Sequence, residues 1–313
     1  MMGLIVNEWV KIFKRKTTYI MIGILALLIL ASSIVIVTTD NEQSPDNNWK
    51  TELQMQNREM EKSIESMPGE QNKELIRKDI AENEYRIEHN ISPAEDYSAW
   101  SFIEDMMQLI DIVALLTIIV AAGMVASEFS WGTIKLLLIR PISRVKILLS
   151  KYVVVLLFSL AMLLLLFIIS FVCGAIFFGL DNPSPYLAYA DGKIVEQNFV
   201  IHLVTNYLLS SIGLLMFTTM AFMISAAFRS SSLAIGISIF LLLAGGTITT
   251  LLAAKFEWAK YLLFANVNLT QYFESVPMVE GMTLTFSVIM LFIYFIIFHV
   301  ISFWVFVKRD VAA

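Results

Sequence analysis

The sequence holds few residues that could carry out covalent chemistry. It contains no Gly-x-x-x-x-Gly-Lys-Ser/Thr phosphate loop, no His-Glu-x-x-His zinc motif and no Gly-x-Ser-x-Gly nucleophile motif. The histidines His89, His202 and His299 lie far apart without metal-ligand spacing, and the single cysteine, Cys173, lies inside an apolar run. We therefore predict no catalytic residue, no metal site and no cofactor bound by this chain, which lacks a P-loop with which to hydrolyse ATP.

The stretch from Ser127 to Lys151, SEFSWGTIKLLLIRPISRVKILLSK, is more ordered than a plain loop. The apolar run at 136–139 predicts a short element at the membrane surface, which Pro141 ends and after which Ser143 can cap the next helix. Three basic residues follow, and we expect them to face cytoplasm or phosphate headgroups: Arg144, Lys146 and Lys151.

This stretch resembles the intracellular connection of the ABC-2 permease family, which carries an acidic residue, Gly-Thr, a leucine-rich run, Pro-x-Ser-Arg and a Lys at the start of the next span. The residues that match are Glu128, Gly132, Thr133, Leu137, Pro141, Ser143, Arg144 and Lys151. The usual Gly before the Lys is Ser150 here, and Trp131 stands where smaller or charged residues are common.

The resemblance implies an ATPase-coupling role for these residues, with Trp131 included. In that role the connection docks into a groove on a separate cytoplasmic ABC ATPase subunit, which uses the ATP and Mg, and passes its closure to the membrane helices. The alternative is a basic loop that only sets the topology.

The elements that position this connection are predicted from hydropathy. The chain has 313 residues, 58% of them hydrophobic and 16% charged, which is outside the balance of a soluble domain. Since runs of bilayer length must form helices, we predict an all-α integral membrane protein with six transmembrane helices. The predicted spans are 17–39, 107–126, 152–179, 200–228, 231–254 and 283–307. The first reads as a retained helix rather than a cleaved signal peptide.

Lys and Arg placement sets the orientation, because basic residues near span ends favour the cytoplasm. With both termini inside, the inner segments hold many Lys and Arg residues against only Glu8, Glu128 and Asp310. Apolar residues also share one face of the N-terminal stretch (Ile5, Trp9, Ile12 and Phe13), which favours an interfacial helix over a simple basic anchor.

Residues 40–105 form the largest polar piece, an extracellular insertion within a single membrane domain spanning 1–313. Apolar residues recur at helical spacing on both sides of Pro68-Gly69, which predicts a helical hairpin. A solvated spacer and a substrate- or peptide-sensing element are both compatible with it.

The spans are nearly free of ionisable residues. Asp111 lies near the outer end of the second span, either solvated or lining a pathway, and Arg229 lies at the break between the fourth and fifth. The resemblance implies that residues 255–282 form short helices dipping into the outer leaflet.

Taken with the predicted spans, the resemblance to the ABC-2 family implies a permease subunit of an ATP-driven exporter, which we expect in a bacterial plasma membrane. Its expected partners are the ATPase, a second permease chain in a homo- or heterodimer, and membrane lipid, but no nucleic acid. The cargo stays open among peptide, drug-like, lipid-linked and ionic substrates. One rival is a membrane sensor or regulatory scaffold that uses the extracellular hairpin; another is an intramembrane enzyme, which the absence of paired acids or histidines in the spans disfavours.

Overall fold

The computed structural model describes residues 1–40, 48–67, 70–92, 97–133, 141–181, 183, 185–190, 193–228, 230–274 and 277–308. Within these ranges six helical stretches are long and apolar enough to cross a membrane. They are α2 (Lys16–Asp40); α5 (Ala99–Met106) continued through η1 (Met107–Leu109) into α6 (Ile110–Ser130); α8 (Arg144–Phe177); α9 (Phe199–Phe228); α10 (Ser231–Ala253); and α13 (Leu284–Lys308). The chain is thus a mainly helical, multi-pass membrane protein.

Each predicted span falls on one of these stretches, but two of them are longer than predicted. The second and third begin about two helical turns earlier, at Ala99 and Arg144. Polar residues such as Glu104 and Lys146 interrupt the apolar runs there, so hydropathy alone ended the spans too soon. A helical hydrogen-bond ladder does not require apolar side chains, and it continues through both positions.

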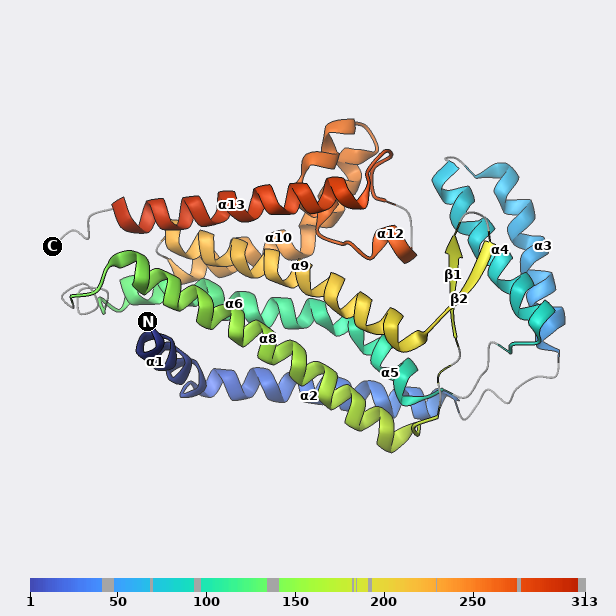
Figure 1. Ribbon diagram of the computed structural model, residues 1–313, viewed down its shortest axis with the longest axis horizontal. Coiled ribbons are helices and arrows are strands. Elements are labelled where there is room, and N and C mark those ends of the chain that lie inside the picture. The colour runs from blue at the N-terminus through green and yellow to red at the C-terminus, as the bar shows by residue number, and fades with distance from the viewer. Residues whose placement is uncertain are drawn as a thin grey trace.

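The long helices run along a common direction, and the molecule has two distinct ends (Figure 1). The start of α1 (Met2–Phe13), the end of α6, the start of α8 and the end of α13 lie at one end, which we call the α1 end. The hairpin of α3 (Trp49–Ser66) and α4 (Glu70–His89) lies at the other, the hairpin end. Segments far apart in sequence therefore meet at the α1 end.

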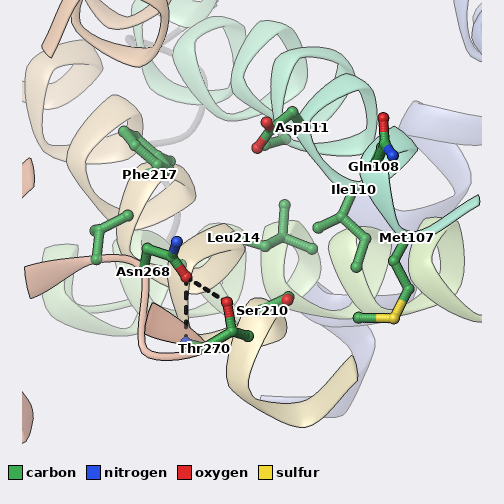
Figure 2. Close-up of a pocket in the computed structure, with 12 residues that line it drawn as sticks. Met107, Gln108, Ile110, Asp111, Ser210, Leu214, Phe217, Asn268 and Thr270 are labelled. Atoms are coloured by element: carbon green, nitrogen blue, oxygen red, sulfur yellow. Dashed lines mark hydrogen bonds between the residues drawn. The ribbon is translucent and has the colours of Figure 1, made fainter. Parts of the chain in front are cut away.

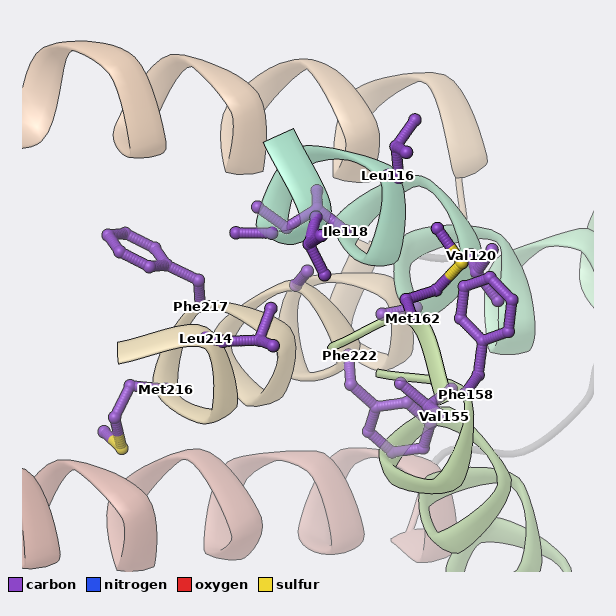
Figure 3. Packing of buried hydrophobic residues seen from close by; sticks show 14 of the residues in the cluster. Leu116, Ile118, Val120, Val155, Phe158, Met162, Leu214, Met216, Phe217 and Phe222 are labelled. Carbon is purple, nitrogen blue, oxygen red and sulfur yellow. The ribbon is translucent and has the colours of Figure 1, made fainter. Parts of the chain in front are cut away.

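Helix α6 is the centre of the packing, because it contacts α8, α9 and α10. Figure 3 shows side chains from three of these helices interlocking, among them Ile118, Phe158 and Phe222, all of which are fully or almost fully buried. Polar side chains also join the helices: Ser225 of α9 donates to the Ala122 carbonyl of α6 at 2.5 Å. Such bonds within the apolar interior fix the rotation of α9 against α6.

The outer helices expose the apolar surface that a lipid environment would cover. Large apolar side chains of α10 and α13 are exposed, including Leu243, Leu251, Phe292 and Val300. In water a contiguous patch of this kind would drive aggregation, so it is consistent with hydrocarbon as the solvent.

The α3–α4 hairpin is confirmed within the predicted insertion. Its two helices pack against each other, with Leu53 of α3 buried and Asn83 Nδ2 donating to Asn57 Oδ1 at 2.8 Å. The predicted breaker, Pro68-Gly69, lies outside the described residues. At the other boundary of the insertion, α5 packs along α8, where a Cβ on Gly174 would come within 2.9 Å of the Ala99 Cα.

A short antiparallel β-hairpin, absent from the sequence-based expectation, lies between α8 and α9. It pairs β1 (Tyr186–Ala190) with β2 (Lys193–Gln197) and contacts α4. Tyr85 of α4 donates its hydroxyl to Glu196 of β2 at 3.1 Å. Asp191-Gly192 separates the strands in sequence, and this dipeptide favours a two-residue hairpin turn.

Between α10 and α13 the chain forms the short helices expected there: η2 (Glu257–Tyr261), α11 (Leu263–Asn266) and α12 (Gln271–Glu274). Asn266 holds this connection together, donating to the Lys260 and Leu262 carbonyls at 2.8 and 2.7 Å and accepting from Ser287 at 2.7 Å. Phe264 packs directly over Gly245, since a Cβ there would lie 2.5 Å from the ring. The connection is thereby anchored to both α10 and α13.

Candidate functional site

Four charged side chains from three separate elements meet at the α1 end. Lys151 of α8 places its Nζ 2.8 Å from Glu8 Oε2 and 2.9 Å from Glu128 Oε1. Lys11 Nζ lies 2.8 Å from Glu8 Oε1 and 3.3 Å from Glu128 Oε1. We call Glu8, Lys11, Glu128 and Lys151 the charge cluster; its two acids and two bases balance in charge.

The charge cluster is largely withdrawn from solvent. Lys151 is 1% exposed, Glu8 4% and Glu128 8%, whereas the Lys11 side chain keeps 40% of its surface accessible. A buried ion is costly unless each charge has a partner, and here each glutamate faces both lysines. The cluster is therefore a joint in which loss of any one member leaves a buried charge underpaired.

Local sequence explains how each member reaches the joint. Glu8 lies on the face of α1 that carries Ile12, which is 2% exposed, so packing of that face carries the carboxylate inward. Glu128 lies in the last turn of α6, where the Thr133 hydroxyl donates to its carboxylate. Burial lowers the pKa of Lys11, but its hydrogen bonds and attraction to Glu8 and Glu128 outweigh burial and raise that pKa above the usual value.

The predicted connection leaves the charge cluster directly. After α6, Gly132 takes a left-handed φ of +72°, which favours glycine and turns the chain out of the helix. Trp131 before it is 67% exposed, and the Arg15 guanidinium lies 5.5 Å from its ring centroid. The stretch thus presents one large aromatic side chain outward beside a basic helix end.

The far side of the connection is tied to α13. Pro141 and Ser143 are exposed, and Ser143 occupies the N-cap position of α8 without a side-chain cap hydrogen bond. Arg144 donates from its guanidinium to the Val307 carbonyl at 3.0 Å. Leu137, with the rest of 134–140, lies outside the described residues.

Sequence reasoning was wrong about Lys151. We expected it to face cytoplasm or headgroups with Arg144 and Lys146, but α8 starts early enough to place Lys151 about two turns inside, against Glu8 and Glu128. The same reasoning missed Glu8 and Lys11 as site residues. The available signal was an acidic residue on the apolar face of an amphipathic helix.

Other ionisable residues singled out from the sequence lie away from the cluster. His202 is buried at the hairpin end, stacked on Tyr186 at 3.4 Å between ring centroids. His299 of α13 lies edge-on to Tyr152 with 4.6 Å between centroids, as a helix-packing residue. Asp111 begins α6 and is exposed, and Arg229 lies outside the described residues.

Comparison with known proteins places the chain among bacterial relatives. The uncharacterized protein YhcI of Bacillus subtilis (strain 168) is 52% identical over 315 residues, covering 100% of both chains. The uncharacterized membrane protein YdbK of the same organism is 34% identical over 224 residues, covering 71% of this chain and 87% of its own. Residues 71–312 match the family described as "Protein of unknown function (DUF2705)". The chain belongs to the DUF2705 family.

Proposed function

We propose that this chain is the transmembrane permease subunit of an ATP-driven transporter of the ABC-2 type, which exports a peptide, drug-like or lipid-like substrate. In this proposal the chain hydrolyses nothing itself. A cytoplasmic ATPase docks on the connection between α6 and α8, and two permease chains, identical or similar, enclose the pathway.

The observation that carries the proposal is the joint at the base of that connection. Glu128, Thr133 and Lys151 match the family pattern, and they are brought into one hydrogen-bonded group with Glu8. A loop whose only role was to set the topology would need exposed basic residues, but it would not need a buried charge cluster of this kind. A mechanical linker needs a stiff base, so that a push on the exposed part moves whole helices rather than bending the chain.

The joint also specifies which helices would move together. Through Lys151 it holds α1, α6 and α8, and through Arg144 the start of α8 holds the end of α13. Docking at Trp131 would therefore displace these helices as a unit against α10, whose outer face is largely exposed.

Charge distribution supports placing the α1 end in the cytoplasm. The basic residues described there are Lys11, Lys14, Arg15, Lys16, Arg144, Lys146, Lys151 and Lys308, against the acids Glu8 and Glu128. Cytoplasmic segments near span ends carry such an excess. On this orientation α1 lies at the inner membrane surface and the α3–α4 hairpin is outside.

The proposal is tested by purifying the tagged chain from its native bacterial host in detergent and measuring ATPase activity in the eluate. Trp131→Ala should lose most of the co-purifying ATPase, because truncating an exposed aromatic anchor at an interface costs about 2 kcal/mol or more. Trp258→Ala is the matched control, since Trp258 is 50% exposed but lies in η2 toward the hairpin end. An eluate without ATPase from the wild type, or equal activity from both variants, would contradict the proposal.

One observation favours the rival function, a sensor. The α3–α4 hairpin contacts β2 through the hydrogen bond between Tyr85 and Glu196. The α3–α4 hairpin and the β1–β2 hairpin therefore form one structured unit, which we call the head, rather than a loose spacer. Deleting residues 52–90 separates the two functions in the same assay. A permease should keep its co-purifying ATPase, whereas a sensor that assembles through the head should lose it.

A further inference from the structure

Two neighbouring cavities, both open on one side, lie among the membrane helices toward the hairpin end. The first, about 410 Å³, lies between α6, α9 and the turn that follows α11 (Figure 2). The second, about 360 Å³, reaches α10. They share the lining residues Asp111, Phe217, Val267 and Asn268, and each falls in the size range of small-molecule sites.

Among the described residues that line either cavity, Asp111 is the one with an ionisable side chain. Figure 2 shows its carboxylate on the α6 side, across the space from Asn268 and Thr270. Within the described ranges, Asp111 has neither a hydrogen bond nor an ion pair, and the lining contributes no Lys, Arg or His. The cavity therefore carries one negative charge without an internal counter-charge.

The rest of the lining divides into a polar part and an apolar part. The first cavity also presents Gln108 and, beside Thr270, Ser210 (Figure 2), and Asn268 Oδ1 is fixed by accepting from Thr270 N at 3.1 Å and Oγ1 at 2.7 Å. The second cavity is walled by apolar side chains, which include Leu115, Leu242, Phe264 and Met278. Phe217 belongs to both and bridges the two parts.

This wall is built on rigid elements. The ring of Phe264 packs over Gly245. At Gly213 of α9 the Val267 carbonyl oxygen lies close to the helix: a Cβ added to this glycine would be 3.3 Å from it. A larger residue at either glycine would push the connection away from the helices. Close contacts at these two glycines therefore help to set the shape of the cavities.

We propose that the paired cavities bind an amphiphilic organic cation, with its ammonium or guanidinium group against Asp111 and its apolar body passing Phe217 into the second cavity. Asp111 is exposed to both cavities at the start of α6, and a carboxylate that lines a cavity between membrane helices attracts a positive group, which here the ligand supplies. One carboxylate is too few for a hard metal ion, which takes about six oxygen ligands. Read as a statement about the transported substrate, this inference rests on the proposed transport function. It narrows the cargo of the proposed transporter to amphiphilic cations.

Binding is measured on the chain alone in nanodiscs of zwitterionic lipid, with rhodamine 6G as the cationic probe and fluorescence anisotropy as the readout. Empty nanodiscs supply the blank for partition into lipid. Rhodamine B, which carries a free carboxylate on a related ring system, is the matched probe and should bind much more weakly. Because no ATPase is present, the result is independent of whether the Trp131 connection docks one.

Asp111→Asn keeps the shape of the side chain and removes its charge, so the Kd for rhodamine 6G should rise about tenfold or more, which is 1.4 kcal/mol per factor of ten. Asp111→Glu should stay near wild type. Asp105→Asn removes a charge from the preceding turns of the same stretch, outside both cavities, and should leave the Kd unchanged.

Leu242→Trp fills part of the second cavity and leaves the charge of Asp111 in place, and it should also weaken rhodamine 6G binding by about tenfold or more. Unchanged affinity in Asp111→Asn, or equal affinity of the two rhodamines, overturns the inference. If the cation binds as described while the pull-down yields no ATPase, the cavity stands and the transport function fails.

Discussion

At the residue scale, Lys151 is the most buried member of the charge cluster, and it contacts both of the cluster's acids. It is 1% exposed, and its ammonium contacts both glutamates at 2.8 and 2.9 Å. Lys11 also contacts both acids, but from a half-solvated position. Removing Lys151 therefore leaves two buried carboxylates that share one remaining lysine.

Lys151→Met should destabilise the chain by about 3–5 kcal/mol, the usual cost of breaking a buried ion pair from one side. The measurement is the thermal unfolding midpoint in detergent. Lys146→Met, on an exposed position of the same helix, is the control and should change stability by less than about 0.5 kcal/mol.

A second substitution, at a partner of Lys151, separates the effect of lost charge pairing from the effect of lost packing. Lys151→Met combined with Glu8→Gln should recover part of the loss, because Glu128 then no longer shares Lys11 with a second carboxylate. Equal midpoints for the two methionine variants, or no recovery in the double variant, would show that the cluster does not couple α1 to α8.

At the element scale, close approach of helices decides how the bundle is assembled. The α5–α8 contact depends on Gly174, whose missing side chain leaves room for the Ala99 backbone. Small residues at such crossings let two backbones approach, and close packing stabilises helices in lipid, where water does not drive them together.

Gly174→Ala should cost about 1–3 kcal/mol, because its Cβ would meet the Ala99 Cα at 2.9 Å and backbone cannot move aside cheaply. Gly236→Ala is the matched control in α10, with nothing within 4 Å of the added Cβ. That change should be neutral or should add roughly 0.5–1 kcal/mol, since alanine favours helix. Unfolding midpoints in detergent check both, and a harmless Gly174→Ala would mean that α5 is held elsewhere.

Elements with a strong local pattern could be predicted from the sequence, and those defined by distant partners could not. The apolar runs predict all six candidate spans, and helical spacing around Pro68-Gly69 predicts α3 and α4. The strands β1 and β2 are five residues each, too short for their alternation to stand out beside the membrane helices. Their contact with α4 joins segments that no local pattern relates.

The candidate site was predicted in part for the same reason. The family pattern identifies Glu128, Thr133 and Lys151 because they lie within one stretch of sequence. Glu8 pairs with Lys151 across 143 positions, so no spacing rule connects them. Ser143 indicates where α8 begins, but hydropathy starts the predicted span only at residue 152, so Lys151 was expected at the membrane surface instead of buried between helices.

At the scale of the whole molecule, the two ends differ in charge and in structure. The α1 end gathers basic residues around the connection, while the hairpin end carries α3, α4 and the β-hairpin. This polarity favours one orientation across a membrane and separates the proposed docking surface from the α3–α4 hairpin.

The orientation is tested by cysteine labelling in a Cys173→Ala background, since Cys173 is buried and its removal leaves the chain without thiols. A membrane-impermeant maleimide added to intact cells should label Val195→Cys on β2 and not Lys146→Cys at the start of α8. Both positions are exposed, so permeabilised cells should label both. The reverse pattern would place the basic end outside and remove the connection from reach of a cytoplasmic ATPase.

The charge cluster also has a consequence for the order in which the chain is made. Glu8 leaves the ribosome 143 residues before its partner Lys151, which is about 7–30 s at ordinary rates of synthesis. During that interval Glu8 has Lys11 of its own helix as a partner but not the buried Lys151 of α8, so we expect α1 to stay at the membrane surface while α2 and α6 are inserted. Arrival of α8 completes the pairing, and the first helix to be translated is therefore among the last to reach its final place.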